Sequence, residues 1–238
     1  MSSYKLTYLN VRALAETSRI LFYLAKQPYE GKYFIKIKYI ILLMHILVFL
    51  SCRIDYRYPV DLATMHRPEF DADQAKGKFA IALDRLPILT VDGKFELAQS
   101  KSIERYLAKK FGFFGATLEE EGTIDMLTEH IRDIKQKYHD SVAGKTGEEV
   151  NNAKHAFITE QLPKWLGKLE LVVESDTYSV GNKLTLADVT IQQFLHDYLD
   201  DKETVAAIVA KYPKLRGITA TVTEAAKGWL ESRPVTIR

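Results

Sequence analysis

The residues from 86 to 100 constrain the fold of this chain more than any other stretch. β-Forming residues at 88–91 are followed by Asp92-Gly93, a strong hairpin signal because both residues tolerate positive φ. A short second strand and a helical pattern come next. Ser100 is a good N-cap for that helix, whose first N–H groups favour an anion. Pro87 opens the first strand, where proline removes a ladder donor and is compatible with a cis bond. The stretch predicts a hairpin followed by a helix, a pattern that an ordinary structural hairpin shares.

The part of the chain before this hairpin alternates between strand and helix signals. A strand is expected at 5–9 and a helix at 14–26. A second strand is expected at 55–59 and a loose surface helix at 70–83. With the hairpin and a helix at 100–111, the order is β-α-β-α-β-β-α. This is the order of a thioredoxin-like α/β domain.

Strand signals stop after residue 111. Glycines in 112–118 indicate a linker, and the rest of the chain reads as helices. These helices are expected at 118–143, at 148–174 with a bend at Pro163, from Thr185 onward, and near 203–212. The sequence therefore predicts an α/β domain over 1–111 and an all-α helical domain over 112–238.

Composition excludes several classes of protein. The 33 basic and 31 acidic residues nearly cancel and form no Lys/Arg cluster, so no nucleic-acid partner is expected. One cysteine, Cys52, excludes an internal disulfide framework and a multi-cysteine metal site. The six histidines show no metal-ligand spacing, so no metal is expected. Without a signal-peptide pattern at its start, the chain is expected to be cytoplasmic and to bind no membrane.

Several motifs occur in a fixed order along the chain: Tyr4–Asn10 with Arg12 and Glu16, Leu86–Leu89, Val91–Gly93, Gln99-Ser100, Arg105–Lys110 and Gly181–Asp188. The last contains the capping box Thr185…Asp188 with Leu184 as a hydrophobic staple, which has a structural role in folding rather than a catalytic one. Taken together, these segments resemble sigma-class glutathione transferases of the cytosolic superfamily.

The resemblance implies that glutathione is a co-substrate and that no other cofactor is needed. A free thiol is only slightly ionised at neutral pH, so the site must lower the thiol pKa. In the family a tyrosine at the end of the first strand donates a hydrogen bond to the sulfur, and Tyr8 holds that position. Tyr8 is therefore the expected catalytic residue, the alternative being a plain strand tyrosine. The expected reaction is conjugation of glutathione to small hydrophobic electrophiles. A glutathione-dependent isomerase, such as a prostaglandin D synthase, and a non-catalytic crystallin-like or ligand-carrying relative are the alternatives.

Matched positions imply how glutathione is held. The Leu86 backbone, before Pro87, would pair with the cysteinyl part as an added strand. Gln99 and Ser100 would hold the γ-glutamyl carboxylate. The full implied set is Arg12, Lys78, Arg85, Leu86, Pro87, Gln99, Ser100 and Asp133.

Three positions in the implied site need separate comment. Lys78 falls where the family often binds the glycyl carboxylate, but Gln74 replaces the aromatic residue expected one turn earlier. Leu14 replaces the second arginine of the usual opening. Asp133 matches an acidic residue that crosses a homodimer interface to the γ-glutamyl amine, the alternative being a solvated helix charge.

One segment departs from the family pattern. Residues 39–52 are apolar and uncharged, yet shorter than the roughly 20 residues of a membrane-spanning helix. Joining Glu30 directly to Asp55 would restore the expected Pro-Tyr-Glu-Asp run. The hypothesis is that Gly31 to about Ile54 is a translated intron. A genuine inserted loop or membrane-touching helix is the alternative.

Overall fold

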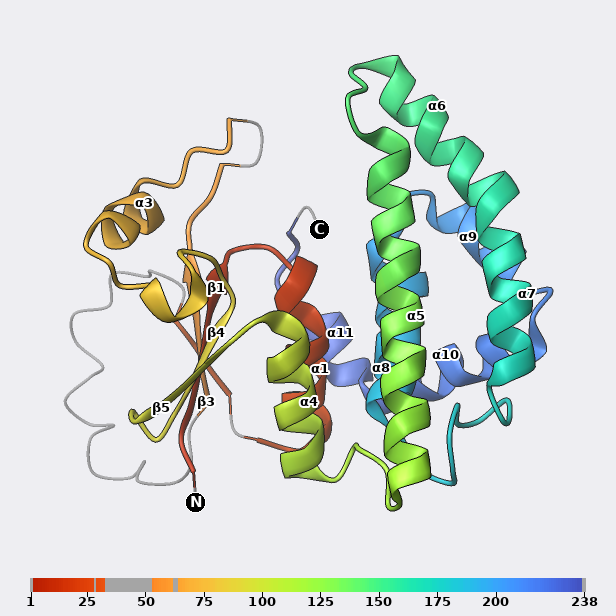
Figure 1. Cartoon of the computed structure of the whole chain (residues 1–238), viewed down its shortest axis with the longest axis horizontal. Coiled ribbons are helices and arrows are strands. Elements are labelled where there is room, and N and C mark those ends of the chain that lie inside the picture. Colours follow the sequence, from red (N-terminus) through yellow and green to blue (C-terminus); the bar gives the residue numbers. More distant parts are fainter. Residues whose placement is uncertain (1, 28, 33–52, 62–63, 237–238) are drawn as a thin grey trace. The chain divides into compact units, whose positions relative to one another are not determined.

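Strand β1 (Tyr4–Leu9) lies at the centre of a five-stranded sheet in the computed structural model, which describes residues 2–27, 29–32, 53–61 and 64–236. The sheet order is β2-β3-β1-β4-β5. β3 pairs with β1, and β2 with β3, in parallel, whereas β4 and β5 run antiparallel to their neighbours (Figure 1). The other strands are β2 (Tyr29–Lys32), β3 (Arg53–Tyr58), β4 (Ile88–Val91) and β5 (Phe95–Ala98).

Helices α1 (Glu16–Leu24) and α4 (Ser100–Phe111) lie on the same side of the sheet, and α3 (Pro68–Ala75) lies on the other (Figure 1). A 3₁₀ turn at Ala13–Ala15 leads into α1. The α/β core is apolar: Leu6 and Leu89 on the strands and Ile20, Leu21, Phe22, Ile103 and Leu107 on the helices are fully buried.

The predicted hairpin is confirmed. Asp92 and Gly93 have φ values of 53° and 65°, as a tight two-residue turn requires, and they connect β4 to β5. The Leu86-Pro87 bond is cis. One detail was wrong: Ser100 is the first residue of α4 rather than the cap before it. Gln99, with φ of 71°, takes the cap position and accepts from the Ile103 N–H through its carbonyl.

The helical part of the chain begins with α5 (Leu118–Val142), whose buried stripe of Ile124, Leu127, Ile131, Ile134 and Tyr138 matches the predicted one. The expected helix at 148–174 is divided into α6, a π-helical segment at Phe157–Gln161, and α7, which starts one residue before Pro163. The remaining helical bounds are α6 (Glu148–Ala156), α7 (Leu162–Val172), α8 (Leu186–Gln192), a second π-helical segment (Gln193–Tyr198), α9 (Lys202–Val209), α10 (Pro213–Ala225) and α11 (Lys227–Ser232).

The capping box at the start of α8 is present as predicted. The buried Asp188 carboxylate accepts from the Thr185 N–H at 2.7 Å and from the Ser179 N–H at 2.6 Å. Each bond satisfies a backbone donor that would otherwise be buried without a partner. These bonds give the motif a structural role in folding.

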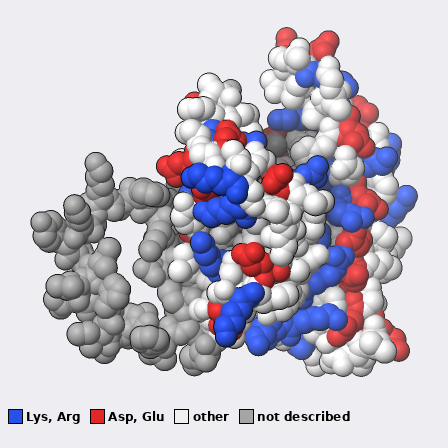
Figure 2. Space-filling view, turned by 60° about the vertical axis from the view of Figure 1, so that its left-hand side comes forward, with Lys and Arg blue, Asp and Glu red and all other residues white. Residues whose placement is uncertain are grey.

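The chain divides into two compact units, residues 1–107 with 233–238 and residues 108–232. The first is an α/β unit and the second is all-helical; the division falls within α4, whereas the sequence predicts it after residue 111. The short C-terminal segment after α11 belongs to the α/β unit. On the face shown in Figure 2, basic and acidic side chains are interspersed.

Strand β2 was not predicted from the sequence; it overlaps the start of the hypothesised insertion at residues 31–54. The predicted second strand at 55–59 is β3, beginning two residues earlier. Most of the hypothesised insertion lies outside the described residues. Its two ends do not: Gly31 lies in β2 and Ile54 in β3.

The pairing of β2 with β3 supports a prediction about that segment. Every residue of β2 lies opposite the residue 24 positions later, for example Tyr29 opposite Arg53. Joining Glu30 to Asp55 removes the same number of residues, so Tyr29 and Glu30 would take the places of Arg53 and Ile54 beside β1 without changing the register.

We expect the variant lacking residues 31–54 to fold. Its free energy of unfolding should change by less than about 2 kcal/mol, since loop-closure entropy depends only weakly on loop length. Urea denaturation with circular dichroism measures this. An unfolded or aggregated product would show that the segment is an integral part of the fold.

Candidate functional site

The end of β1, the start of β4 and the end of β5 lie at the same edge of the sheet. Thr7 of β1 lies opposite Ile88 of β4, and Ile88 lies opposite Ala98 of β5. Tyr8 follows Thr7, Pro87 precedes Ile88, and Gln99 follows Ala98. The register alone therefore places Tyr8 next to Pro87 on the neighbouring strand, with Gln99 one strand further along the same edge.

Tyr8 is buried near the end of β1, with 6% of its surface exposed. Its hydroxyl oxygen accepts from the Leu14 N–H at 3.4 Å. The Arg19 guanidinium lies 6.0 Å from the ring centre. Burial raises the pKa of the Tyr8 hydroxyl, while the Leu14 N–H and the Arg19 charge act against the rise. The hydroxyl is thus a protonated donor at neutral pH.

Leu86 joins two apolar clusters at this edge. Its half-buried side chain packs against the cluster of Leu6, Tyr8, Val11 and Ala15, and also against the cluster that contains Tyr58, Phe70 and Phe79. Arg85, just before it, is exposed. The backbone at Leu86 therefore lies beside the tyrosine whose hydroxyl would meet the glutathione sulfur.

The start of α4 supplies polar groups to the same edge. Gln99 is exposed and Ser100 is half-buried, so both side chains are accessible. The first N–H groups of a helix have no intrahelical partner and carry partial positive charge, which suits a carboxylate.

Lys78 is held by an ion pair that the sequence did not predict. Its ammonium lies 2.6 Å from Asp73 Oδ2 and donates to the Tyr58 hydroxyl at 3.2 Å. The Tyr58 hydroxyl itself donates to Asp73 at 2.6 Å, and burial together with this bond raises the pKa of Tyr58 to about 12. Because Tyr58 ends β3 opposite Leu9, Lys78 is anchored at the same edge as Tyr8. Gln74, at the position of the missing aromatic residue, donates instead to the Asp84 carbonyl at 2.9 Å.

Arg12 contacts the C-terminal segment, which no local pattern indicates. Its Nη2 donates to the Thr236 carbonyl at 3.0 Å. Asp133, the remaining predicted residue, lies on α5 in the helical unit, with 68% of its side chain exposed.

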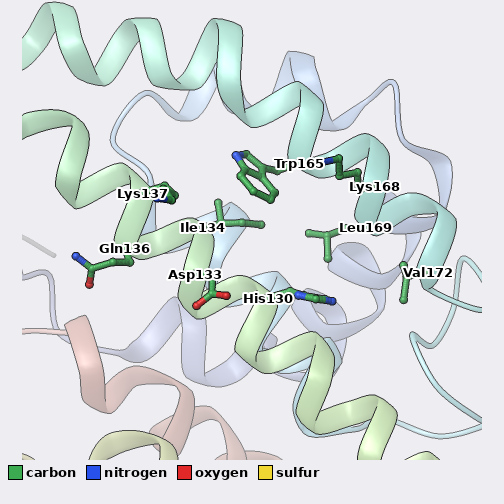
Figure 3. Close-up of a pocket in the computed structure, with 9 residues that line it drawn as sticks. All are labelled: His130, Asp133, Ile134, Gln136, Lys137, Trp165, Lys168, Leu169 and Val172. Carbon is green, nitrogen blue, oxygen red and sulfur yellow. The ribbon is translucent and has the colours of Figure 1, made fainter.

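Asp133 lines a cavity of about 420 Å³ between α5 and α7 (Figure 3). Apolar walls come from Ile134, Leu169 and the Trp165 ring, whose centre lies 5.1 Å from the Lys168 ammonium. The full lining is His130, Asp133, Ile134, Gln136, Lys137, Trp165, Lys168, Leu169 and Val172.

The described residues hold neither a metal-binding cluster nor a membrane-spanning helix. No group of three or more His, Cys, Asp or Glu side chains in this part of the chain is placed to hold a metal ion. Within the same residues, no helix has the length and apolarity needed to span a membrane.

Comparison with known proteins identifies relatives along the whole chain. The family model for the glutathione S-transferase C-terminal domain matches residues 132–233. The chain is 30% identical to glutathione S-transferase 3 of Caenorhabditis elegans, over 99% of each protein. It is 32% identical to glutathione S-transferase S1 of Drosophila melanogaster, over 98% of this chain and 80% of that protein. It is 29% identical to hematopoietic prostaglandin D synthase of Gallus gallus, over 99% of each. A crystal structure of a nematode-specific glutathione S-transferase from C. elegans superimposes with a TM-score of 0.72, at 27% identity over 100% of both chains.

Proposed function

Because the chain belongs to the glutathione S-transferase family, an enzyme family, we propose that it conjugates the thiolate of glutathione to small hydrophobic electrophiles. In this proposal Tyr8 donates its hydroxyl hydrogen to the sulfur. The cytoplasm is the proposed location and a homodimer the proposed assembly.

The observation that carries the proposal is the sheet register. It sets Tyr8, the Leu86-Pro87 backbone and Gln99-Ser100 at one edge, as a site for an extended tripeptide requires. The middle residue of glutathione would pair with Leu86 as a short added strand, which directs its sulfur toward Tyr8. Since burial keeps Tyr8 protonated, its hydroxyl stabilises the thiolate more than the thiol and lowers the thiol pKa.

The two ends of the tripeptide would meet opposite faces of this edge. The γ-glutamyl carboxylate would bind the first N–H groups of α4 and the Ser100 hydroxyl. The glycyl carboxylate would bind Lys78, with Arg85 and Arg12 adding positive charge. Since Asp73 already pairs with Lys78, that pair carries little net charge, and Arg85 and Arg12 would supply the positive charge at this end. Leu14, 52% exposed, would contact the apolar electrophile.

A second candidate reaction is glutathione-dependent isomerisation. It is favoured by the full-length similarity to a prostaglandin D synthase. The same thiolate would attack the substrate and then leave, so glutathione would not be consumed. Measuring whether glutathione disappears during turnover separates the two reactions.

Retention on immobilised glutathione, followed by a conjugation assay with a chromogenic electrophile, tests the proposal. Retention with turnover is the expected result. Retention without turnover would indicate a non-catalytic carrier, and a folded protein that is not retained would overturn the proposal.

Replacing Ser100 with Ala is expected to raise the Kd for glutathione roughly 10-fold to 150-fold. The variant loses one hydrogen bond to a charged carboxylate, a contact worth roughly 1.5–3 kcal/mol. Isothermal titration calorimetry measures the change. Ser102→Ala is the matched control, because Ser102 is a half-buried serine of the same helix, two residues further on. Equal affinities of the two variants would exclude Ser100 from the glutathione site.

A further inference from the structure

Leu14, whose N–H donates to the Tyr8 hydroxyl, lies in a loop that is held in place by Arg233 and Thr236 near the end of the described chain. We propose that Arg233 and Thr236 form a C-terminal clasp that positions this loop, residues 11–15, for catalysis. The role rests on the proposed conjugation reaction. Arg233 is a positioning residue in this proposal and does not touch glutathione.

The clasp is built from two contacts that span nearly the whole chain. Arg233 Nη1 lies 2.8 Å from Glu16 Oε1, and their side chains are 7% and 1% exposed. The Thr236 carbonyl accepts from Arg12 Nη2 at 3.0 Å. An ion pair this buried is screened little by water, so it restrains both partners more than a surface pair would.

A chain of contacts runs from the clasp to the tyrosine. Glu16 Oε2 lies 3.3 Å from Arg19 Nη1, and the same Nη1 donates to the Val11 carbonyl at 2.8 Å. These bonds restrain the start of the loop at Val11. Leu14, three residues further on, donates its N–H to the Tyr8 hydroxyl oxygen at 3.4 Å. An N–H that donates to a phenol oxygen makes the phenol a better donor toward a bound thiolate.

The loop needs such restraint because its backbone is strained. Ala13 has a φ of 28°, in the left-handed region that costs free energy for residues with a Cβ atom. Strained conformations persist only where surrounding contacts enforce them. Without the clasp, Ala13 is expected to relax and to withdraw the Leu14 N–H from Tyr8.

The decisive experiment compares Arg233→Ala with the wild type over a range of pH. The pH at which kcat/KM reaches half of its maximum, which reports ionisation of the glutathione thiol, should be higher in Arg233→Ala. The reason is that a weakened Tyr8 donor stabilises the thiolate less. At a pH below this midpoint kcat/KM should fall roughly threefold to tenfold, the size expected for one hydrogen bond. Arg233→Lys, which can keep the charge pair, should recover part of the loss. Val235→Ala is the control, since Val235 lies in the same segment and is fully exposed.

Two further measurements separate positioning from general stability. Amide hydrogen exchange of residues 11–15 should become faster in Arg233→Ala and stay unchanged in Val235→Ala. In a background carrying Ala13→Gly, which removes the strain, the effect of Arg233→Ala on kcat/KM should shrink. A folded Arg233→Ala variant with a wild-type pH profile would overturn the clasp, even if its loop exchanged faster. A wild type that lacks conjugation would overturn the proposed function first, and is recognised before any variant is compared.

Discussion

Replacing Tyr8 with Phe is expected to lower kcat for conjugation about 100-fold near neutral pH, with little change in glutathione affinity. The variant keeps the ring packed among Leu6, Val11 and Ala15 and removes only the hydroxyl. Removing one preorganised hydrogen-bond donor to a negatively charged reacting atom typically lowers kcat by a factor of this size. The binding groups at Leu86, Gln99 and Ser100 are untouched.

The dependence of kcat on pH in the Tyr8→Phe variant should show whether the loss of activity comes from a raised thiol pKa. Without the donor, the pKa of the bound thiol rises toward that of free glutathione, so the activity of the variant should approach that of the wild type as pH increases. Because burial raises the pKa of Tyr8 in the wild type, its hydroxyl stays protonated over the range where the thiol ionises. Loss of the Tyr8 hydroxyl proton should therefore cause no fall in wild-type activity at alkaline pH, up to the ordinary pKa of tyrosine.

Tyr4→Phe provides the matched control. Tyr4 lies on the same strand, four residues away, and is also buried. Stopped-flow spectra of the bound thiolate, together with steady-state kinetics, report on both variants. Full activity in Tyr8→Phe would remove Tyr8 from the mechanism.

Replacing Asp55 with Ala is expected to lower the free energy of unfolding by about 3–5 kcal/mol. The Asp55 carboxylate lies 3.0 Å from Arg19 and 2.7 Å from Arg57, and all three side chains are at most 5% exposed. Removing it takes this carboxylate away from two buried guanidinium groups, although Arg19 keeps its contact with Glu16 at 3.3 Å. Urea denaturation measures the loss.

The same group makes stability depend on pH. Burial opposes ionisation of Asp55, but the charges of Arg19 and Arg57 outweigh it and lower the pKa below its ordinary value of 3.8. A lowered pKa means that the stabilisation is present above the unfolded-state value and is lost as pH falls through the folded-state value. The wild type should therefore lose more stability than Asp55→Asn between neutral pH and about pH 3.

Asp71→Ala is the control for this prediction. Asp71 also pairs with an arginine at 3.0 Å, but the two side chains are 34% and 51% exposed. Exposed pairs contribute at most about 1 kcal/mol, because water and salt screen them. A loss in Asp55→Ala no larger than in Asp71→Ala would show that the buried cluster does not stabilise the fold.

Several elements of the chain were predictable because their causes are local. The Asp92-Gly93 turn follows from the φ values that these two residues tolerate, and the start of α8 follows from the Thr185–Asp188 capping box. The apolar stripe of α5 follows from helical spacing. The family resemblance then implied roles for Tyr8 and Ser100 that no local pattern determines.

Other features depend on residues that meet only in the folded chain. Strand β2 is four residues long and is recognisable only through its pairing with β3. The ion pair of Lys78 with Asp73 and its hydrogen bond to Tyr58 were not predicted. Nothing near Lys78 in the sequence indicates that a tyrosine 20 positions earlier shares its contacts.

The sequence by itself determined the order of elements apart from β2, the hairpin, an α/β half followed by a helical half, and the family, since each rests on contacts between near neighbours or on matched motifs. Only the tertiary structure decided that Tyr8, Pro87 and Gln99 share one sheet edge, because that depends on strand register. It alone also joined Arg233 to Glu16, 217 residues away in the chain. Contacts at such separations arise from the packing of the whole unit, and no local pattern encodes them.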